Sequence, residues 1–392
     1  MRLPGGVRDW LPPELRRKRA VEAALRGVFE RWAYAEVQTP TFERFDVLET
    51  GLGDAFDDKV FLFNDRRGTQ LALRPDMTTP IARLVSTRMR EAPRPLRLAY
   101  VQPAFRYEEP QEGRTREFTQ AGLELIGALS VDADAESLFT AIEALDALGL
   151  TDVRFDINHA AVIDGILGSQ ALEAGLARRA KLLIAQRNIV DLRETFAAAG
   201  RADAIEPLVK FAMMRGGREA IDAARDSCAT HAGHAGLDRL SQILERAEGL
   251  GYASRIAVDF SLLRDLSYYT GFIFEGFARE VGFSLCGGGR YDELLPRFGL
   301  DTGAVGWSVS VERLLIALER RHAQAFGDAP AVDVLVSGSD VVAARERAAG
   351  RVVRIDFAHR GESDLLAEAR RQRIPRVVIS ENGRVREIEV GA

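Results

Sequence analysis

Apolar residues recur at helical spacing near the start of the chain, around residue 140 and again after residue 310. The amphipathic helices predicted from this spacing are residues 13–33, 135–148 and 311–318. Each is expected to bury one face against the rest of the protein. In the first helix that face consists of Val21, Leu25, Val28, Phe29 and Trp32.

Short apolar runs between these helices predict strands that end at turn residues. Two of the runs flank the polar segment 64–68, which is typical of a hairpin, and two longer runs flank the polar loop 108–114. Short connections of this kind join antiparallel strands. The strands predicted in this part of the chain are residues 36–39, 60–63, 70–73, 98–107 and 115–126.

Residues 159–250 differ in character from the rest of the chain. They are rich in alanine and predict helices, so we interpret them as a helical insertion. The expected breaks between its helices are Gly200, Gly216-Gly217 and Gly233. After the insertion, strands are predicted at residues 256–260, 268–277 and 282–286.

The end of the chain predicts a second, smaller domain. Residues 327–330 form a linker rich in small residues, and residues 331–392 alternate short strands with helices, which is typical of a small α/β domain. Because one hydrophobic core rarely exceeds about 250–300 residues, a chain of 392 residues is expected to divide. The predicted domains are residues 1–325 and 331–392.

Composition adds the expected cellular setting. Hydrophobic residues make up 46% of the chain and charged residues 28%, values that are ordinary for a soluble folded protein. The net charge of -5 argues against nucleic acid as the main partner. Two cysteines, no apolar run long enough to span a membrane and no signal peptide predict a protein of the cytoplasm.

Side chains that suit ligand binding gather on the hairpin of residues 98–126. Arginine guanidinium groups suit phosphate oxygens, and a carboxylate beside an amide suits an ammonium group. The alternative is a sheet with one solvated side, and residue types alone do not separate the two. The strand period of two places Arg116, Phe118, Gln120, Gly122 and Glu124 on one face, and Arg106 and Arg114 flank the tip.

Two further segments carry candidate acceptors and hydroxyls. The turn at 74–78 can present Asp76 and Thr78 as hydrogen-bond acceptors, or it can simply begin a helix. The segment 264–275 carries consecutive tyrosines, which point to opposite sides of a strand. The alternative for the tyrosines is core packing with one exposed hydroxyl.

Three other segments are also ambiguous. The glycines at 287–289 permit close approach of the backbone or a bend, and residues 306–313 predict a strand that enters a helix with Arg313 in its first turn. Cys228, His231 and His234 lack a fourth ligand of matching spacing. That spacing favours a surface turn over a zinc site.

Together these segments resemble the class II aminoacyl-tRNA synthetases, and histidyl-tRNA synthetase in particular, over residues 1–325. The helix that ends at Trp32, with Thr39-Pro40 after it, resembles motif 1, the dimer element. The resemblance implies an α+β fold, with an antiparallel sheet flanked by helices, a helical insertion and a small C-terminal α/β domain. Residues 105–124 and 306–313 resemble motifs 2 and 3, and residues 264–275 and 288–292 resemble the two signatures of the histidine family.

The resemblance also implies roles for single residues. Arg106 and Arg313 match the arginines that grip ATP phosphates, and Arg114 belongs to the same vestigial ATP site. Asp76 and Thr78 match an amine-binding acid and threonine, and Arg264 matches the arginine used at the adenylation step. No metal ligand and no cofactor is implied. The complete set of implied histidine-binding residues is Asp76, Thr78, Gln120, Glu124, Arg264, Tyr268, Tyr269 and Tyr291.

Departures from the synthetase pattern indicate a different relative. The synthetase turn has Glu-Gly where this chain has Asp76-Met77, and the first histidine signature has Gly and Asp where this chain has Asp265 and Ser267. An acid beside the phosphate-binding arginines lowers affinity for phosphate. Ser310 replaces a motif 3 glycine and is expected to crowd an adenosine on the sheet. The C-terminal segment is short and near neutral, whereas an anticodon-binding domain carries basic surface.

These features resemble the family of ATP phosphoribosyltransferase regulatory subunits, the paralogues of the synthetase in histidine biosynthesis. The resemblance implies a non-catalytic chain that dimerises through motif 1 and joins the short-form catalytic subunit in a hetero-oligomer. Such a chain activates its partner and confers feedback inhibition by histidine in the first step of the pathway. Neither a membrane nor a nucleic-acid partner is expected.

Two alternatives remain at this point. One is an active histidyl-tRNA synthetase with a reduced anticodon-binding domain, because Arg106, Arg264 and Arg313 are all present. The other is a free-standing module that binds histidine or a tRNA-like RNA, and the near-neutral C-terminal segment argues against RNA.

Overall fold

The computed structural model describes residues 2–52, 59–109, 111–170, 172–263, 269–321, 332–381 and 384–390. The protein forms two compact units that divide at residue 327. The predicted linker and four residues singled out from the sequence, Arg264, Asp265, Ser267 and Tyr268, lie outside the described residues. Within the described ranges, the helices are all too short or too polar to cross a membrane.

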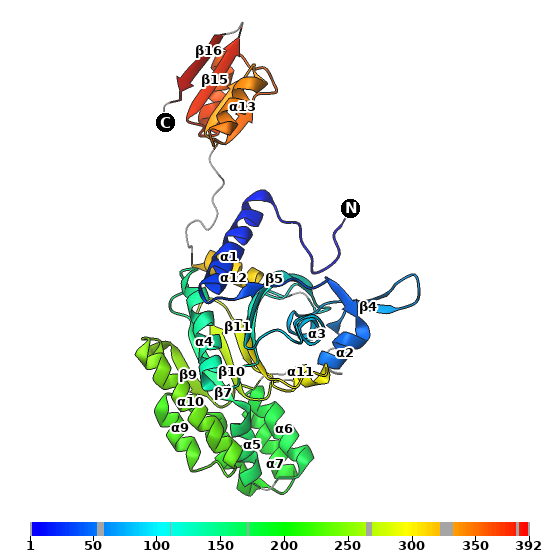
Figure 1. Cartoon of the computed structure of the whole chain (residues 1–392). Coiled ribbons are helices and arrows are strands. Elements are labelled where there is room, and N and C mark those ends of the chain that lie inside the picture. Colours follow the sequence, from blue (N-terminus) through cyan, green and yellow to red (C-terminus); the bar gives the residue numbers. More distant parts are fainter. Residues whose placement is uncertain are drawn as a thin grey trace. The chain divides into compact units, whose positions relative to one another are not determined.

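The larger unit is built on a nine-stranded sheet (Figure 1). In spatial order its strands are β1 (Ala35–Glu36), β5 (Leu96–Phe105), β6 (Glu117–Ile126), β12 (Ala304–Ser310), β11 (Ser284–Arg290), β10 (Phe272–Phe277), β7 (Arg154–His159), β9 (Ile256–Asp259) and β8 (Arg215–Gly216). Neighbours are antiparallel except for the pairs β1–β5 and β7–β9. The long hairpin β5–β6 confirms the prediction from alternation, whereas β1 is shorter than the predicted strand.

One face of this sheet is covered by long helices. They pack against the positions of β6 that alternate with the polar ones, Ala121, Leu123 and Leu125, which are all buried in the main core. This alternation leaves the intervening residues of β6 to the opposite face. The helices are α1 (Pro12–Arg31), α4 (Val131–Asp146) and α12 (Val311–Arg320).

The other face carries a second, smaller core. Leu98 and Tyr100 of β5 belong to it, together with Met77. Its elements are the three-stranded antiparallel sheet β2 (Phe42–Arg44), β4 (Gln70–Leu73) and β3 (Leu62–Asn64), with helices α2 (Phe45–Leu52), α3 (Thr78–Arg88) and α11 (Leu294–Arg297). The β3–β4 hairpin confirms the sequence prediction.

The predicted insertion is helical, and its helices gather at one end of the sheet (Figure 1). Gly233 was expected to break a helix but lies in the first turn of α10, where the absent side chain lets Cys228 approach closely. The elements of the insertion are α5 (Ala160–Ser169), α6 (Ala174–Ala185), α7 (Ile189–Ala198), η2 (Ala202–Ala204), α8 (Ile205–Ala212), β8, α9 (Arg218–Arg225) and α10 (His231–Gly249), and η3 (Ala253–Arg255) leads back to the sheet.

The glycines at 287–289 do not form a bend. All three lie inside β11, which is paired on both sides. A side chain at Gly288 would meet the carbonyl oxygen of Gly306 at 2.3 Å, and one at Gly289 would meet that of Phe272 at 2.5 Å. The close approach of backbones, one of the two expectations, therefore explains Gly288 and Gly289.

The smaller unit is a four-stranded sheet with one helix on each face. Its elements are β13 (Val334–Ser337), α13 (Asp340–Ala348), β14 (Val353–Ile355), α14 (Glu362–Arg371), β15 (Arg376–Glu381) and β16 (Arg384–Glu389), in the spatial order β14-β13-β15-β16. The sequence predicted this α/β unit but missed β16. That strand is a mostly exposed edge rich in charge, so it lacks the alternation of a half-buried strand.

Candidate functional site

A cavity of about 670 Å³ lies over β6, β11 and β12 in the larger unit, a size typical of small-molecule sites. It contains every one of the site residues predicted from the sequence that the structure describes. These residues are Asp76, Thr78, Arg106, Arg114, Gln120, Glu124, Tyr269, Tyr291 and Arg313. The cavity has a carboxylate half, around Asp76 and Glu124, and an arginine half, around Arg106, Arg114 and Arg313.

Glu124 is the centre of the carboxylate half. It is 1% exposed, and its carboxylate accepts hydrogen bonds from the hydroxyls of Thr78 (2.9 Å), Tyr100 (3.3 Å) and Tyr291. Burial raises the pKa of Glu124 to about 8, although the three hydroxyls oppose this rise. Gly306 lies directly beneath the carboxylate, where any side chain would collide with it.

The second carboxylate, Asp76, lies in the turn that precedes α3. Its Oδ1 accepts from the backbone N–H of Thr79 (3.2 Å). The turn therefore also begins a helix, which was the alternative interpretation of this segment. Its Oδ2 is buried and receives no hydrogen bond from the described residues. Burial raises the pKa of Asp76, and the positive charge of Arg106 works against this rise. A buried carboxylate oxygen without a donor is costly unless a ligand supplies one.

Gln120 holds this turn in place. Its Oε1 accepts from the backbone N–H of Met77 (3.0 Å), and its Nε2 donates to Ser308 Oγ (2.9 Å) on β12. The side-chain amide therefore fixes the Asp76 turn against the sheet while it lines the cavity.

Arg74 anchors the Asp76 turn to the neighbouring segments. It was not predicted as a site residue. Its guanidinium, 1% exposed, donates to the carbonyl oxygens of Thr39 (2.7 Å), Pro40 (3.0 Å) and Pro103 (2.8 Å), and to Gln102 Oε1 (2.9 Å). Burial lowers the pKa of Arg74 to about 10. The motif 1-like segment, β5 and the Asp76 turn are thus tied together by one side chain.

The arginine half has a different character. Arg313 Nε donates to the carbonyl oxygen of Gly113 (2.9 Å) and its Nη1 to that of Ser284 (2.9 Å), while Arg106 Nε donates to that of Pro75 (2.8 Å). Burial lowers the pKa of Arg313, and the positive charges of Arg106 and Arg114 add to the effect. These arginines lie close together, but two of them, Arg106 and Arg313, bind main-chain oxygens in or beside the cavity wall.

Ser310, expected to crowd an adenosine, caps helix α12. Its hydroxyl accepts from the backbone N–H of Arg313 (3.4 Å) and donates to Glu312 (3.1 Å). A serine at this position is a favourable N-cap. It also lines the cavity, so the substitution both adds bulk there and fixes the helix that carries Arg313.

Several residues that line the cavity, or that bind a lining residue from behind, were not identified from the sequence. Tyr100 donates to Glu124, Ser308 accepts from Gln120, and Glu275 and Cys286 line the wall. The strand period places Tyr100 and Gln102 on one face of β5, and pairing with β6 puts that face on the same side of the sheet as Gln120 and Glu124. The period within β5 is therefore a signal that could have indicated Tyr100. The insertion contributes Ala185 and Gln186.

The segment with Cys228, His231 and His234 is more than a surface turn. Cys228 is buried with a free thiol, and Thr230 caps α10. Over the described part of the chain, His, Cys, Asp and Glu side chains form no group of three or more that could hold a metal ion.

The sequence matches the family model described as histidyl-tRNA synthetase over residues 6–314. A protein of Moorella thermoacetica named ATP phosphoribosyltransferase regulatory subunit is 40% identical over 376 residues, which cover 94% of this chain and 95% of that protein. A protein of Symbiobacterium thermophilum with the same name is 38% identical and covers 96% of each chain.

Solved structures agree with these matches. A Bacillus halodurans chain, described as an ATP phosphoribosyltransferase regulatory subunit/histidyl-tRNA synthetase, is 31% identical with a TM-score of 0.83 and covers 94% of this chain and 96% of that one. The histidyl-tRNA synthetase of Nostoc sp. PCC 7120, 22% identical, has a TM-score of 0.81 over 99% and 96% of the two chains, which shows the shared fold. The predicted α+β fold of the class II synthetase type is confirmed.

Proposed function

We propose that this chain, which belongs to the family of ATP phosphoribosyltransferase regulatory subunits, is the histidine sensor of that transferase. Membership in this family gives it a regulatory, non-catalytic role in histidine biosynthesis and favours that role over the synthetase alternative. The short-form catalytic subunit is its partner and carries the chemistry. The site of action we propose is the cytoplasm, where the two free thiols remain reduced.

The observation that carries the sensor proposal is the pair of buried carboxylates. Asp76 Oδ2 receives no hydrogen bond from the described residues, and Glu124 lies in the same cavity. Histidine offers two nitrogen groups that donate hydrogen bonds, its ammonium and its imidazole. A ligand of this kind pairs both carboxylates and offsets the cost of their burial. The arginine half supports a non-catalytic role, because Arg313 donates to main-chain oxygens instead of leaving its fork open.

The regulatory step follows from these contacts. In our proposal, histidine orders the Asp76 turn and the region of Tyr269 and Tyr291, and this order favours a less active state of the hetero-oligomer. Such coupling between two sites is reciprocal, so the less active state also binds histidine more tightly.

One experiment tests the function and its alternative together. Histidine binding and histidine-dependent exchange of pyrophosphate into ATP are measured on the purified chain with magnesium. Activation of a short-form transferase is measured in parallel. We expect binding and activation without exchange. Robust exchange would identify a synthetase, and an absence of any effect on the transferase would contradict the regulatory proposal. If Glu124→Ala left inhibition by histidine unchanged, the effector would bind at another site, such as a subunit interface.

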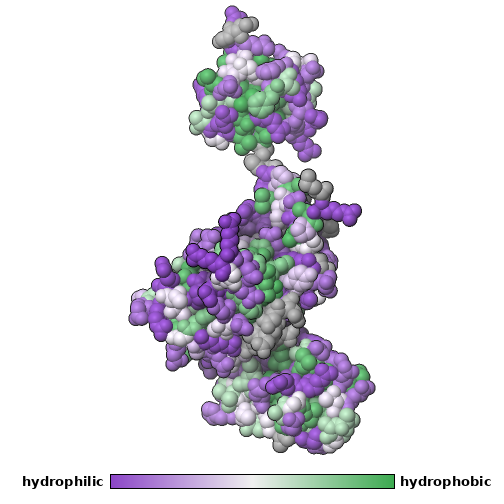
Figure 2. All heavy atoms as spheres, turned by 90° about the vertical axis from the view of Figure 1, so that its right-hand side faces the viewer, coloured by the Kyte–Doolittle hydropathy of each residue, from purple (hydrophilic) through white to green (hydrophobic). Residues whose placement is uncertain are grey.

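We also propose a homodimer through the motif 1-like segment. Phe42, 52% exposed, follows that segment and contacts Phe63, 40% exposed, with ring centroids 6.0 Å apart. Figure 2, which views the molecule from the side of β4, shows hydrophobic side chains exposed among hydrophilic ones. Exposed apolar clusters of this kind mark association surfaces.

The dimer proposal predicts that Phe42→Asp produces monomers in light scattering at concentrations where the wild type is dimeric. The matched control is Phe357→Asp, which removes an even more exposed phenyl ring (82%) from the smaller unit. A dimer that survives Phe42→Asp would place the interface elsewhere.

A further inference from the structure

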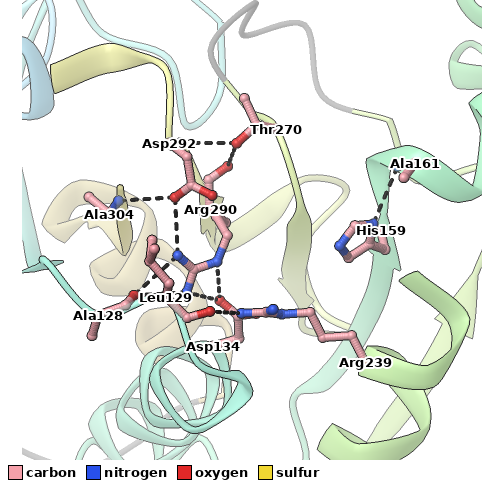
Figure 3. Close-up of polar contacts among 10 residues, drawn as sticks. All are labelled: Ala128, Leu129, Asp134, His159, Ala161, Arg239, Thr270, Arg290, Asp292 and Ala304. Carbon is pink, nitrogen blue, oxygen red and sulfur yellow. Dashed lines mark hydrogen bonds and ion pairs between the residues drawn. The ribbon is translucent and has the colours of Figure 1, made fainter. Parts of the chain in front are cut away.

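A buried ion-pair network lies behind the cavity, on the side of the sheet that α4 covers (Figure 3). Its centre is Asp134 in the first turn of α4, a side chain with 0% exposure. Two arginines from distant parts of the chain converge on it, Arg290 at the end of β11 and Arg239 in α10. A carboxylate buried this deeply depends on both partners for its charge balance.

Arg290 connects the network to the cavity. Its Nε donates to Asp134 Oδ1 (2.8 Å), and its Nη1 donates to the carbonyl oxygen of Ala128 (3.1 Å) and to Asp292 Oδ1 (3.1 Å). Between the two network residues Arg290 and Asp292 lies Tyr291, whose hydroxyl donates to Glu124. Adjacent residues of an extended chain point to opposite sides, so the network fixes the backbone from which Tyr291 reaches the cavity.

The other cavity tyrosine is held by the same network. Thr270, the residue after Tyr269, donates its backbone N–H to the carbonyl oxygen of Arg290 (2.8 Å) and accepts at its hydroxyl from the backbone N–H of Asp292 (2.9 Å). Tyr269 and Tyr291 both line the cavity, and the residues beside them bind each other. A shift of Arg290 would therefore move both tyrosines.

Arg239 brings the helical insertion into this arrangement. It forms an ion pair with Asp134, and its Nη2 donates to the carbonyl oxygen of Leu129 (2.7 Å). His159 lies nearby, and burial together with the charges of both arginines lowers its pKa to about 4. The histidine is thus neutral, and the charge balance of Asp134 rests on the two arginines.

We infer that Arg239 is a positioning residue that couples the helical insertion to the tyrosines of the cavity, through Asp134 and Arg290. The inference deepens the proposed function and rests on it wherever histidine is the ligand. When α10 holds Arg239 against Asp134, Arg290 and the two tyrosines keep the geometry that binds histidine. By reciprocity, histidine bound at Tyr291 and Glu124 stabilises the packing of α10.

The chain offers a matched control for Arg239. Arg246, two helical turns along α10, forms an ion pair with Asp132, the residue two before Asp134 on α4. Both arginines thus join the same two helices, but the Arg246 pair lies at the surface, apart from the buried network. Arg239→Gln and Arg246→Gln therefore separate the buried network from simple docking of the two helices.

The test measures histidine affinity by calorimetry and amide hydrogen exchange with and without histidine. Arg239→Gln is expected to raise the histidine Kd about tenfold, an effect typical of residues in coupling networks, whereas Arg246→Gln changes it less than about twofold. Histidine protects the amides of residues 231–249 in the wild type and in Arg246→Gln, and this protection is lost in Arg239→Gln. Arg239→Lys, which keeps a cation beside Asp134, restores most of the affinity.

A ligand-free measurement keeps this inference separate from the proposed function. Without histidine, Arg239→Gln is expected to accelerate exchange at residues 269–277 and 284–292, and Arg246→Gln leaves it unchanged. If histidine does not bind the wild type but this acceleration occurs, the sensor proposal fails and the coupling stands. If Arg239→Gln matches Arg246→Gln in ligand-free exchange and in affinity, the coupling is wrong.

Discussion

The two halves of the cavity hold their charged groups in opposite ways. In the carboxylate half, side chains bind side chains: Glu124 accepts from Thr78, Tyr100 and Tyr291, and one oxygen of Asp76 remains without a donor among the described residues. In the arginine half, Arg313 donates to main-chain oxygens of the cavity wall. In our proposal the first arrangement binds a cationic ligand, whereas in the second the guanidinium of Arg313 stabilises the surrounding fold.

The presence of a residue type therefore does not establish its role. Arg106 and Arg313 match the synthetase pattern in sequence, yet Arg106 Nε and two donors of Arg313 stabilise the turn and strand that surround them. The carboxylates, by contrast, are costly to bury, and Asp76 Oδ2 receives no hydrogen bond from the described residues to offset that cost. Groups held at a cost are better indicators of a ligand than groups that are satisfied.

Substitution of Glu124 should weaken histidine binding more than any other change considered below. Glu124→Gln keeps the shape of the side chain but removes the charge, and a buried charge-assisted hydrogen bond is worth about 1.5–3 kcal/mol, so the histidine Kd should rise by about 10–150-fold. Calorimetry on the full chain measures this change. The control is Glu136→Gln, because Glu136 also accepts from a tyrosine, Tyr34 (2.8 Å), outside the cavity. Equal affinities in the two variants would remove Glu124 from the binding site.

The sequence predicted some residues of the carboxylate half and missed others, and the difference has a simple physical reason. Strand alternation depends only on the strand period, and the period alone places Gln120 and Glu124 on one face. Tyr100 was missed because its partner Glu124 lies on the neighbouring strand, and that contact depends on the register of β5 against β6. Arg74 was missed because its five acceptors come from separate segments.

Elsewhere in the fold, features that depend on local sequence patterns were predicted, whereas features that depend on tertiary contacts were not. Helix α1 and the β3–β4 hairpin depend on local periodicity and turn residues, and both were predicted. Gly233 was predicted to be a helix break because glycine is a poor helix former, but its tertiary contact with Cys228 requires the absence of a side chain. Strand β16 is identified by its pairing with β15, which no local pattern of charged residues reveals.

The next largest effect is on the pH dependence of histidine binding. The pKa of Glu124 in the free protein is about 8, so a cationic ligand must displace a proton at lower pH. The histidine Kd should therefore fall by about three- to tenfold between pH 6.8 and pH 7.8. Proton release measured by calorimetry in buffers of different ionisation enthalpy checks the same step. In Glu124→Gln the slope should be flat, and an unchanged slope would assign the proton to another group.

A smaller effect is expected on thermal stability, which Glu124→Gln should raise although it weakens histidine binding. Because burial raises the pKa of Glu124 from its ordinary value of 4.5 to about 8, the protonated form favours the native state. This contribution is fully present below pH 4.5 and is lost as the pH rises through 8. Without histidine, Glu124→Gln should have a Tm about 3–6 °C above that of the wild type at pH 8.5.

The same melting curves contain their own control. Near pH 5, where the wild-type carboxyl is protonated, the difference in Tm between the two proteins should nearly vanish. A wild type that is the more stable protein at pH 8.5 would show that Glu124 is held for the fold and not for a ligand.

The smallest expected effect comes from the arginine half and is the sharpest test of the comparison. Arg313 holds Gly113 of the loop after β5 and Ser284 of β11, and both of these acceptors belong to the arginine half of the cavity wall. Arg313→Gln should therefore change the histidine Kd by less than about threefold, while the amides of residues 111–114 exchange faster because the loop has lost an anchor. Glu319→Gln, which changes an exposed side chain of the same helix, is the control. If ATP altered histidine affinity in the wild type and Arg313→Gln abolished that effect, the guanidinium would bind phosphate, and the two halves would form one working site instead of a sensor beside a structural remnant.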